Sequence, residues 1–385
     1  MFELIYEPII HYNRLMTTWN WQYPDWPNFR YDLSDLFEAL LSISEKMGFL
    51  NGNLVHLAEH LRTDAIINLM VEEAVNTSEI EGEHISRMDI RSSIKNSLGL
   101  YPKNHPVRDR RAHGIAELML DVRDTFNQPL TEEKLFDWHL MLMAHVPRPD
   151  LRVGHWRMSE EPMQIVSGHQ GRWIVHYEAP PASRVPDEMK KFITWFNATA
   201  PNQPRAIQFP PVRAAIAHLY FESIHPFDDG NGRIGRALAE KTLSQGFGYP
   251  VMLSLSQTIE AKKKDYYAAL KAGSGTLEIT EWIRYFIKVV SGSQELVEKQ
   301  IHFILKKAAF FDQFEEVLNE RQLKVIKRMM RSGIKPFEGG INARKYMAIT
   351  KTSKATATRD LQQLFSMHIL KQLGSGRSVR YELNL

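Results

Sequence analysis

One stretch of this 385-residue sequence decides how the chain folds: HPFDDGNGRIGR, residues 225–236. The apolar pattern before it predicts a helix over 211–224. Pro226 and the run of Asp, Gly and Asn that follows must end this helix. A second helix is expected to begin near Arg233. The stretch therefore predicts a tight turn between two helices, with glycines at the N-terminus of the second.

The residues of this turn are suited to binding a nucleotide phosphate. Glycines at a helix N-terminus expose backbone N–H groups, which form an anion cradle together with the helix dipole. Arg233 and Arg236 share a helix face beside it and suit a di- or triphosphate. Asp229 is suited to Mg²⁺, which favours one or two carboxylates plus phosphate oxygens. His225 lies at the lip, where a general base could take a proton from a hydroxyl.

Two common phosphate-binding motifs are excluded. No Gly-Lys-Ser/Thr follows, so the turn is not a Walker A loop, and no strand precedes it, so it is not a dinucleotide-binding fingerprint. A plain polar turn with a capping Asp and surface arginines remains the alternative. The combination of a base, a carboxylate, a Gly-Asn-Gly nest and paired arginines disfavours it.

The stretch resembles the motif of Fic domains, His-Pro-Phe-x-(Asp/Glu)-Gly-Asn-Gly-Arg-x-x-Arg, at every fixed position. The resemblance covers roughly residues 86–290 and implies a protein adenylyltransferase, which moves AMP from ATP to a Ser, Thr or Tyr hydroxyl of a protein, including itself. It implies a mainly α fold, a helical core with a β-hairpin flap. His225 would be the base, and Asp229 would hold Mg²⁺. The residues that it implies for ATP binding are Asp229, Gly230, Asn231, Gly232, Arg233, Arg236 and Tyr267.

Two further segments are similar to parts of the family. Residues 164–177 resemble the flap hairpin, which holds the target segment by strand addition and mainly through its backbone. The flap residues implied are Gln164, Ile165, Val166, Val175, His176 and Tyr177. Tyr266 and Tyr267 resemble the stretch that closes over the adenine, and a plain core role for both remains open. Ser274 stands where relatives often carry Asn, which leaves the adenine contact there in doubt.

Residues 77–82, Thr-Ser-Glu-Ile-Glu-Gly, fit the Fic inhibitory motif (Ser/Thr)-x-x-x-Glu-(Gly/Asn). Thr77, Glu81 and Gly82 occupy its fixed positions. A carboxylate at position 81 would satisfy Arg236 with a bidentate ion pair. The γ-phosphate of ATP would then lose its partner and meet a like charge, so that Glu81 would act as an internal brake.

The neighbouring residues Glu79 and Glu83 supply an alternative, in which the three glutamates form an exposed acidic helix end. Residues two apart on a helix lie on different faces. We therefore expect only Glu81 to act on Arg236.

The C-terminal segment is strongly basic. Residues 320–385 hold 14 Lys and Arg against 4 Asp and Glu, a net charge of +10 in a chain whose total is +3. This segment resembles a winged helix, with a recognition helix at 354–367 and a hairpin at 373–383. Such a domain binds DNA through basic and hydroxyl side chains. Protein contacts or dimerisation are the alternative, and a homodimer is left open.

Composition places further limits on the protein. The chain has no Cys, which excludes thiol nucleophiles, Cys-ligated zinc and iron–sulfur clusters. No apolar run approaches the ~18–20 residues of a membrane span, and the first 14 residues lack the features of a secretory signal. The expected location is the cytoplasm, with no membrane contact. The expected segments are an aromatic-rich helical module (1–60), an inhibitory helix (61–85), the catalytic domain (86–290), a connecting helix (291–319) and the winged helix (320–385).

Alternatives for the function also remain open. The same site could remove AMP, or transfer phosphate or another nucleotide fragment. The chain could also be a DNA-binding regulator or a toxin-type module with a nucleotide-binding core. The target protein, the modified hydroxyl, any DNA site and the role of residues 1–60 are not predicted.

Overall fold

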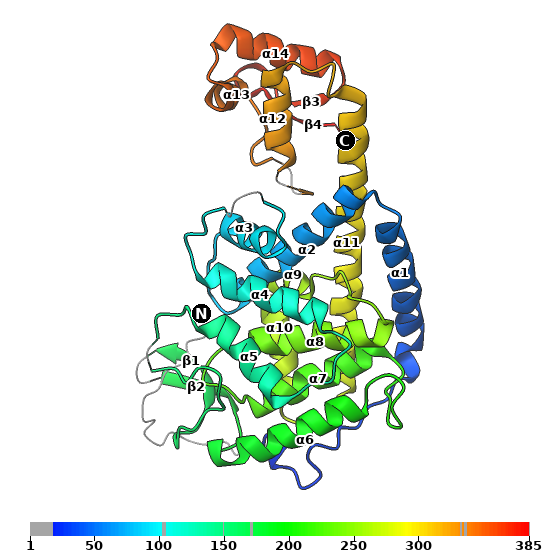
Figure 1. The fold of residues 1–385 in the computed structure, drawn as a ribbon, viewed down its shortest axis with the longest axis vertical. Coiled ribbons are helices and arrows are strands. Elements are labelled where there is room, and N and C mark those ends of the chain that lie inside the picture. The colour runs from blue at the N-terminus through cyan, green and yellow to red at the C-terminus, as the bar shows by residue number, and fades with distance from the viewer. Residues whose placement is uncertain are drawn as a thin grey trace. The chain divides into compact units, whose positions relative to one another are not determined.

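The computed structural model describes residues 18–101, 105–148, 150–169, 172–331, 333–334 and 337–384. The expectation that the N-terminus is not a secretory signal falls on residues outside these ranges. The chain divides into two compact units, and Figure 1 shows that both are mainly helical. The first contains the described residues up to His56 and Ile66–Glu295. The second contains Leu57–Ala65 and Leu296–Leu385.

Two adjoining helices form the centre of the first unit. Helix α7 (Pro210–Ile224) is buried along its whole length, as expected for a helix that is apolar on every side. The turn at 225–230 joins it to α8 (Asn231–Phe247), which packs beside it. Prolines at the first two positions of α7 fix φ where no N–H partner is needed. The predicted helix–turn–helix is therefore confirmed.

Other helices enclose this pair in one apolar core (Figure 1). They are α3 (Arg87–Ser97), α4 (Arg111–Asp124), α5 (Glu132–Met143) and α6 (Val185–Ala198). Thr131 caps α5, because its hydroxyl accepts a hydrogen bond from the Lys134 N–H at 3.1 Å.

The N-terminal aromatic residues pack onto this core. The Trp26 ring contacts those of Phe29 and Tyr220 edge to face, at 5.4 and 5.1 Å. Arg30 forms a parallel β-bridge with Glu278. Helix α1 (Phe37–Val55) follows and buries one face.

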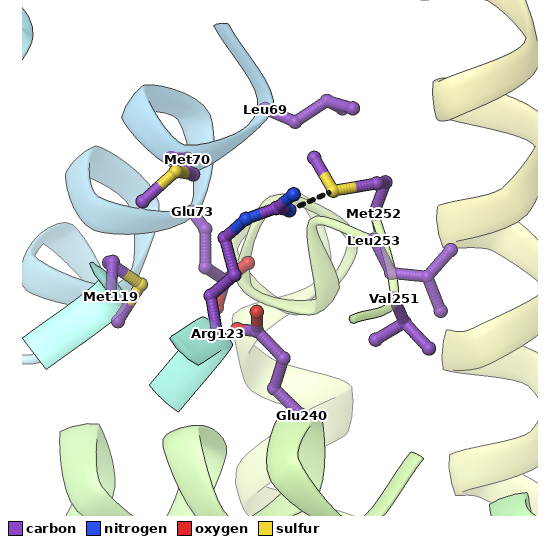
Figure 2. A pocket seen from close by; sticks show the side chains of 9 residues that line it. All are labelled: Leu69, Met70, Glu73, Met119, Arg123, Glu240, Val251, Met252 and Leu253. Atoms are coloured by element: carbon purple, nitrogen blue, oxygen red, sulfur yellow. Dashed lines mark hydrogen bonds between the residues drawn. The ribbon is translucent and has the colours of Figure 1, made fainter. Parts of the chain in front are cut away.

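Helix α2 (Glu59–Ile80) is anchored by a buried carboxylate. Glu73 accepts hydrogen bonds from the Ser256 N–H at 2.9 Å and the Ser254 hydroxyl at 3.2 Å, and from the Ser256 hydroxyl. This contact caps the short helix α9 (Leu255–Glu260). Figure 2 shows Glu73, Arg123 and Glu240 lining a small pocket with apolar side chains around them. Burial raises the pKa of Glu73 despite these hydrogen bonds.

Two helix boundaries differ from those that the sequence pattern predicts. The pattern predicts one helix over 258–271, but α9 and α10 (Lys263–Gly273) are separate helices. It also predicts a helix over 280–290 and a connecting helix over 291–319, but α11 (Thr280–Phe314) is one continuous helix. Gly292 lies within this helix, where a Cβ would be only 3.1 Å from the Thr258 side chain. Close packing therefore explains this glycine better than a helix end.

A two-stranded hairpin forms where it was expected. Strands β1 (Gln164–His169) and β2 (Arg172–Glu178) pair antiparallel, with Gln164 opposite Glu178 and a bulge between Ile165 and Val166.

The described part of residues 320–385, within the second unit, contains three helices followed by a hairpin. These elements are α12 (Glu320–Met330), α13 (Ala343–Thr350), α14 (Lys354–Ser366), β3 (Leu370–Leu373) and β4 (Arg380–Leu383). Buried Asp360 joins the helices, because it accepts hydrogen bonds from Arg321 and from the Tyr346 hydroxyl, both at 2.9 Å. The hairpin begins at Leu370, so its predicted start at Leu373 is wrong.

Among the described residues, we find no helix with both the length and the apolar character needed to cross a membrane.

Candidate active site

The turn between α7 and α8 is held by its own side chains. His225 ends α7 in a left-handed conformation (φ 51°), and Gly230 precedes α8 with φ 81°. The Asn231 side chain accepts a hydrogen bond from the Phe227 N–H at 3.0 Å and donates one to the Phe227 carbonyl at 2.8 Å. The Phe227 ring is buried and stacks on His139. Asn231 thus braces the loop, which leaves phosphate binding at this position to the backbone.

The Glu81 carboxylate lies over the first turn of α8. A Cβ built on Gly232 would be 2.1 Å from Glu81 Oε1, so only glycine fits beside this carboxylate. The same turn carries the N–H groups that were expected to cradle phosphates. A carboxylate therefore occupies the space of the predicted anion cradle.

Arg236 holds this carboxylate. Its Nη2 donates to Glu81 Oε1 at 2.7 Å and to the Thr77 carbonyl at 2.9 Å, and its Nε donates to the Thr77 hydroxyl at 2.8 Å. The expected bidentate pair is wrong, because only one carboxylate oxygen is engaged and Thr77 accepts the hydrogen bond of Nε and a second one from Nη2. Arg236 Nη1 is buried with no hydrogen-bond partner among the described residues.

The charges of this pair stabilise each other. Burial alone would raise the pKa of the Glu81 carboxyl, but the charge and hydrogen bond of Arg236 outweigh it and hold this pKa below its usual value. Burial likewise opposes the charged form of Arg236, and Glu81 raises its pKa in spite of that.

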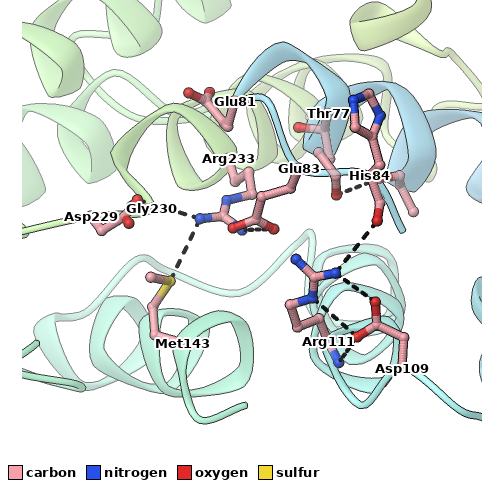
Figure 3. A network of polar contacts seen from close by, with 12 residues as sticks. Thr77, Glu81, Glu83, His84, Asp109, Arg111, Met143, Asp229, Gly230 and Arg233 are labelled. Carbon is pink, nitrogen blue, oxygen red and sulfur yellow. Dashed lines mark hydrogen bonds and ion pairs between the residues drawn. The ribbon is translucent and has the colours of Figure 1, made fainter. Parts of the chain in front are cut away.

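A second glutamate contacts the other motif arginine, as Figure 3 shows. Arg233 Nη1 donates to Glu83 Oε2 at 2.9 Å, and its Nη2 lies 3.5 Å from Asp229 Oδ1. The interpretation of Glu83 as an exposed charge is therefore wrong. Helix α2 ends at Ile80, and Gly82 has φ 82°, so helical spacing no longer applies here. The sequence signal that could have indicated this contact is the match in number between two glutamates, Glu81 and Glu83, and the two motif arginines.

The Asp229 carboxylate lies near two arginines, Arg148 and Arg233. Its side chain is 24% exposed, and its Oδ2 lies 4.0 Å from Arg148. The described ranges contain no group of three or more His, Asp or Glu side chains that could hold a metal on their own. A single carboxylate fits Mg²⁺ only if phosphate oxygens and water complete the coordination.

His225 is buried at the end of α7, with 7% of its surface exposed. Its Nδ1 has no hydrogen-bond partner in the described part of the chain and lies 3.7 Å from Glu222 Oε2. Burial and the charge of Arg157 lower the pKa of His225 to about 4, with Glu81 acting in the opposite direction. Its imidazole is therefore neutral near pH 7, as a general base must be.

Glu222 lies beside this base, and no sequence pattern had indicated it. Burial, with a smaller effect of Glu81, raises the pKa of its carboxyl to about 8. Its Oε1 would lie 2.4 Å from a Cβ at Gly235, so this glycine makes room for it.

The two tyrosines of α10 differ in their surroundings. Tyr266 is buried, and its hydroxyl lies 2.9 Å from His218 Nε2. The Tyr267 hydroxyl donates to the Ile80 carbonyl at 3.2 Å, which joins α10 to the end of α2. Ser274 is buried, and its carbonyl accepts a hydrogen bond from the Asn20 N–H.

The inner side of the hairpin is anchored next to the base. Tyr177 is buried against Trp19, and its hydroxyl donates to the Ser223 carbonyl, two residues before His225. Val166 is also buried, whereas Ile174 is 59% exposed. The other expected flap residues are partly exposed: Gln164, Ile165, Val175 and His176. The fold thus brings residues 77–83 and the motif arginines together and anchors the hairpin next to His225.

Comparisons with known proteins agree with this arrangement. Residues 129–243 match the model of the Fic/DOC family, and residues 19–100 match a domain of unknown function, DUF4172. Relatives named protein adenylyltransferase Fic include one from Nematostella vectensis, 25% identical over 60% of this chain and 48% of its own length. Another, from Drosophila grimshawi, is 33% identical over 66% of this chain and 47% of its own length. The chain therefore spans about half the length of these curated relatives.

A solved structure supports the fold alone. A Fic domain containing signaling protein from Bacteroides thetaiotaomicron aligns with a TM-score of 0.52 at 19% identity. The alignment covers 69% of this chain and 97% of that one.

Proposed function

From the Fic/DOC domain that this chain contains, we propose that the protein transfers AMP from ATP to a hydroxyl group of a protein side chain. The observation that carries the proposal is the anion site over Gly232, where α8 begins and where Arg236 binds a carboxylate. A site where a buried guanidinium binds a carboxylate beside a helix N-terminus also suits a phosphate.

The side chains of the turn divide the work of the reaction. Arg233 and Arg236 bind the phosphates of ATP, together with the backbone of Gly230, Asn231 and Gly232. The neutral imidazole of His225 takes the proton from the incoming hydroxyl, whose oxygen bonds to the α-phosphorus as pyrophosphate leaves. Mg²⁺ bound at Asp229 would neutralise part of the phosphate charge.

Glu81 is the proposed brake on this reaction. Its carboxylate occupies Arg236 and the space over Gly232, which the γ-phosphate of ATP needs. Two like charges cannot share this guanidinium in a buried site. ATP bound beside Glu81 therefore adopts a pose in which the α-phosphate is misaligned for attack by the hydroxyl. Thr77 and Gly82 support the brake from either side.

The hairpin is the proposed holder of the target segment. Strand addition to an exposed edge uses main-chain hydrogen bonds and tolerates varied sequences. Tyr177 fixes the hairpin beside His225 and so brings a bound hydroxyl near the base. Tyr267 closes the nucleotide site from α10.

Incubation with labelled ATP and Mg²⁺, followed by intact mass, tests the proposal. The chain carrying Glu81→Gly should gain the mass of AMP on itself or on an added protein mixture. A mass gain equal to that of phosphate alone would mean that the protein transfers phosphate and not AMP. Loss of AMP from a modified protein, without any gain, would favour the reverse reaction.

Glu83 is expected to contribute a weaker second restraint. Glu83→Gln should raise AMP transfer about three- to tenfold, because it removes an ion pair worth roughly 1 kcal/mol from Arg233. Glu79→Gln is the matched control, since its carboxylate has no described contact with either motif arginine. The measurement is the initial rate of AMP incorporation at saturating ATP. Equal rates for the Glu83 and Glu79 variants would remove Glu83 from the inhibition.

A second proposed activity, DNA binding, rests on the exposed face of α14. Lys354, Thr358 and Arg359 are exposed, while Ala357 and Leu361 on the opposite face are buried. Basic and hydroxyl side chains on one helix face suit phosphate and base-edge contacts.

DNA binding by this face should weaken steeply with salt, by about −0.9 in the log–log slope for each phosphate neutralised. The full chain would be titrated with duplex DNA at two salt concentrations. Arg359→Glu should weaken binding strongly, whereas Lys324→Glu on α12 serves as the control. No binding at low salt would assign this face to protein contacts.

A further inference from the structure

Arg157 donates hydrogen bonds to the backbone carbonyls around the proposed base. It lies in the irregular segment between α5 and β1 and is 2% exposed. Its Nε donates to the His225 carbonyl at 2.7 Å, and its Nη2 donates to the Ile224 carbonyl at 3.4 Å. Its backbone N–H donates to the Pro226 carbonyl at 2.9 Å. One residue thus binds three successive carbonyls where α7 ends.

The turn at His225 needs such support. A left-handed conformation costs a residue other than glycine about 1–2 kcal/mol, and His225 adopts it with φ 51°. The last carbonyls of a helix also lack partners within the helix. A guanidinium reaches several of them at once, because its donors form a fixed fork. This backbone in turn sets the direction of the imidazole.

Arg157 also contributes charge to the surroundings of the imidazole. The ionisable groups that face His225 are Arg157, Glu81 and Glu222, and only Arg157 is a cation. Burial is the largest cause of the lowered pKa of His225, and the charge of Arg157 adds to it. Glu81 acts against both. The cation is therefore placed to disfavour the imidazolium, which cannot accept a proton.

We propose that Arg157 is a positioning residue for the base: it holds the left-handed turn at His225 and places its positive charge against the backbone of that residue. This inference rests on the proposed role of His225 in AMP transfer. The side chain then has two separable tasks. The geometric task is to bind the carbonyls of the turn through the donors of the guanidinium, and the electrostatic task is to disfavour the imidazolium through its positive charge.

Two substitutions separate these tasks in the full chain carrying Glu81→Gly. Arg157→Gln removes the charge, so the acid limb of the pH–rate profile should move upward by about one pH unit. Arg157→Lys keeps the charge but loses the forked donors of the guanidinium. The acid limb of the pH–rate profile should therefore stay at the same pH, while the rate of AMP transfer falls about tenfold or more because the base is misplaced. Single-turnover rates between pH 4 and 9 give both readouts.

A titration independent of catalysis accompanies these rates. Histidines labelled with ¹³C are titrated by NMR, and the His225→Ala variant identifies the signal of His225. That signal should titrate at higher pH in Arg157→Gln than in the parent. The matched control is Arg213→Gln, because Arg213 is another buried arginine that caps helix carbonyls, at α6. It should lower the melting temperature without moving the titration of His225.

An unchanged titration and acid limb in a folded Arg157→Gln variant would overturn the electrostatic task. Full transfer by Arg157→Lys would overturn the geometric one. Should no variant transfer AMP at all, the proposed function fails, while the NMR titration still decides whether Arg157 controls His225.

Discussion

Glu81→Gly is expected to raise AMP incorporation about 100-fold, the largest gain that any single substitution in this chain should give. The change removes a carboxylate that lies 2.7 Å from Arg236 and fills the space over Gly232. A hydrogen bond to a charged group contributes about 1.5–3 kcal/mol, which corresponds to roughly 10- to 150-fold once it is transferred to the γ-phosphate. The measurement is the initial rate of labelled AMP incorporation at saturating ATP and Mg²⁺.

Controls for this gain follow from the same geometry. Glu81→Asp should be intermediate, because the shorter side chain reaches Arg236 less well. The double variant Glu81→Gly with Arg236→Ala should lose the gain, since the freed phosphate partner is absent. Equal activation by Glu79→Gly, or no activation by Glu81→Gly, would contradict the proposed inhibition by Glu81. The proposed roles of the catalytic residues would not be affected by this outcome.

His225→Ala is expected to reduce AMP transfer by about 10²–10⁴-fold, the contribution of a general base. ATP affinity should change little, because the imidazole lies at the end of α7 and the phosphate site lies at α8. Single-turnover rates in the Glu81→Gly background, with ATP binding measured separately, distinguish these effects. Transfer within tenfold of the parent would exclude His225 as the base.

The pH dependence gives a second measure of the same base. The pKa of His225 is lowered to about 4 by burial, then by Arg157. The base is active when deprotonated. Its titration should therefore not change the rate of AMP transfer between pH 6 and 8. The rate should fall as pH decreases through that pKa. A fall already near pH 6.5 would mean that the imidazole is not held in its neutral form.

The sequence predicts most of this site because its strongest signals are local. Pro226 and Gly230 require a turn, and the flanking apolar residues require two buried helices. Glu81 was predicted from a motif, although the detail of the ion pair was not, because Thr77 competes for the donors of Arg236. The expected AMP transfer, inhibition and Mg²⁺ binding at these residues stay predictions.

Two residues escaped prediction for different physical reasons. Glu83 contacts Arg233 because the chain leaves the helix after Ile80, and a rule for helix faces fails beyond a helix end. Arg157 lies in a segment with no periodicity, and its role depends on carbonyls from another part of the chain. Tertiary contacts of this kind leave no pattern in the local sequence.

The anchoring of α2 determines what would have to move to relieve the proposed inhibition. Glu73 ties the middle of this helix to Ser256, and its last turn accepts hydrogen bonds from Lys263 and Tyr267. Displacing the helix would break all these contacts and expose buried apolar side chains, whereas turning the Glu81 side chain breaks one ion pair. The moving part of the proposed switch is then a single carboxylate just beyond the end of a fixed helix. An activating partner would need a coupling free energy of only about 1–3 kcal/mol to turn this side chain away from Arg236.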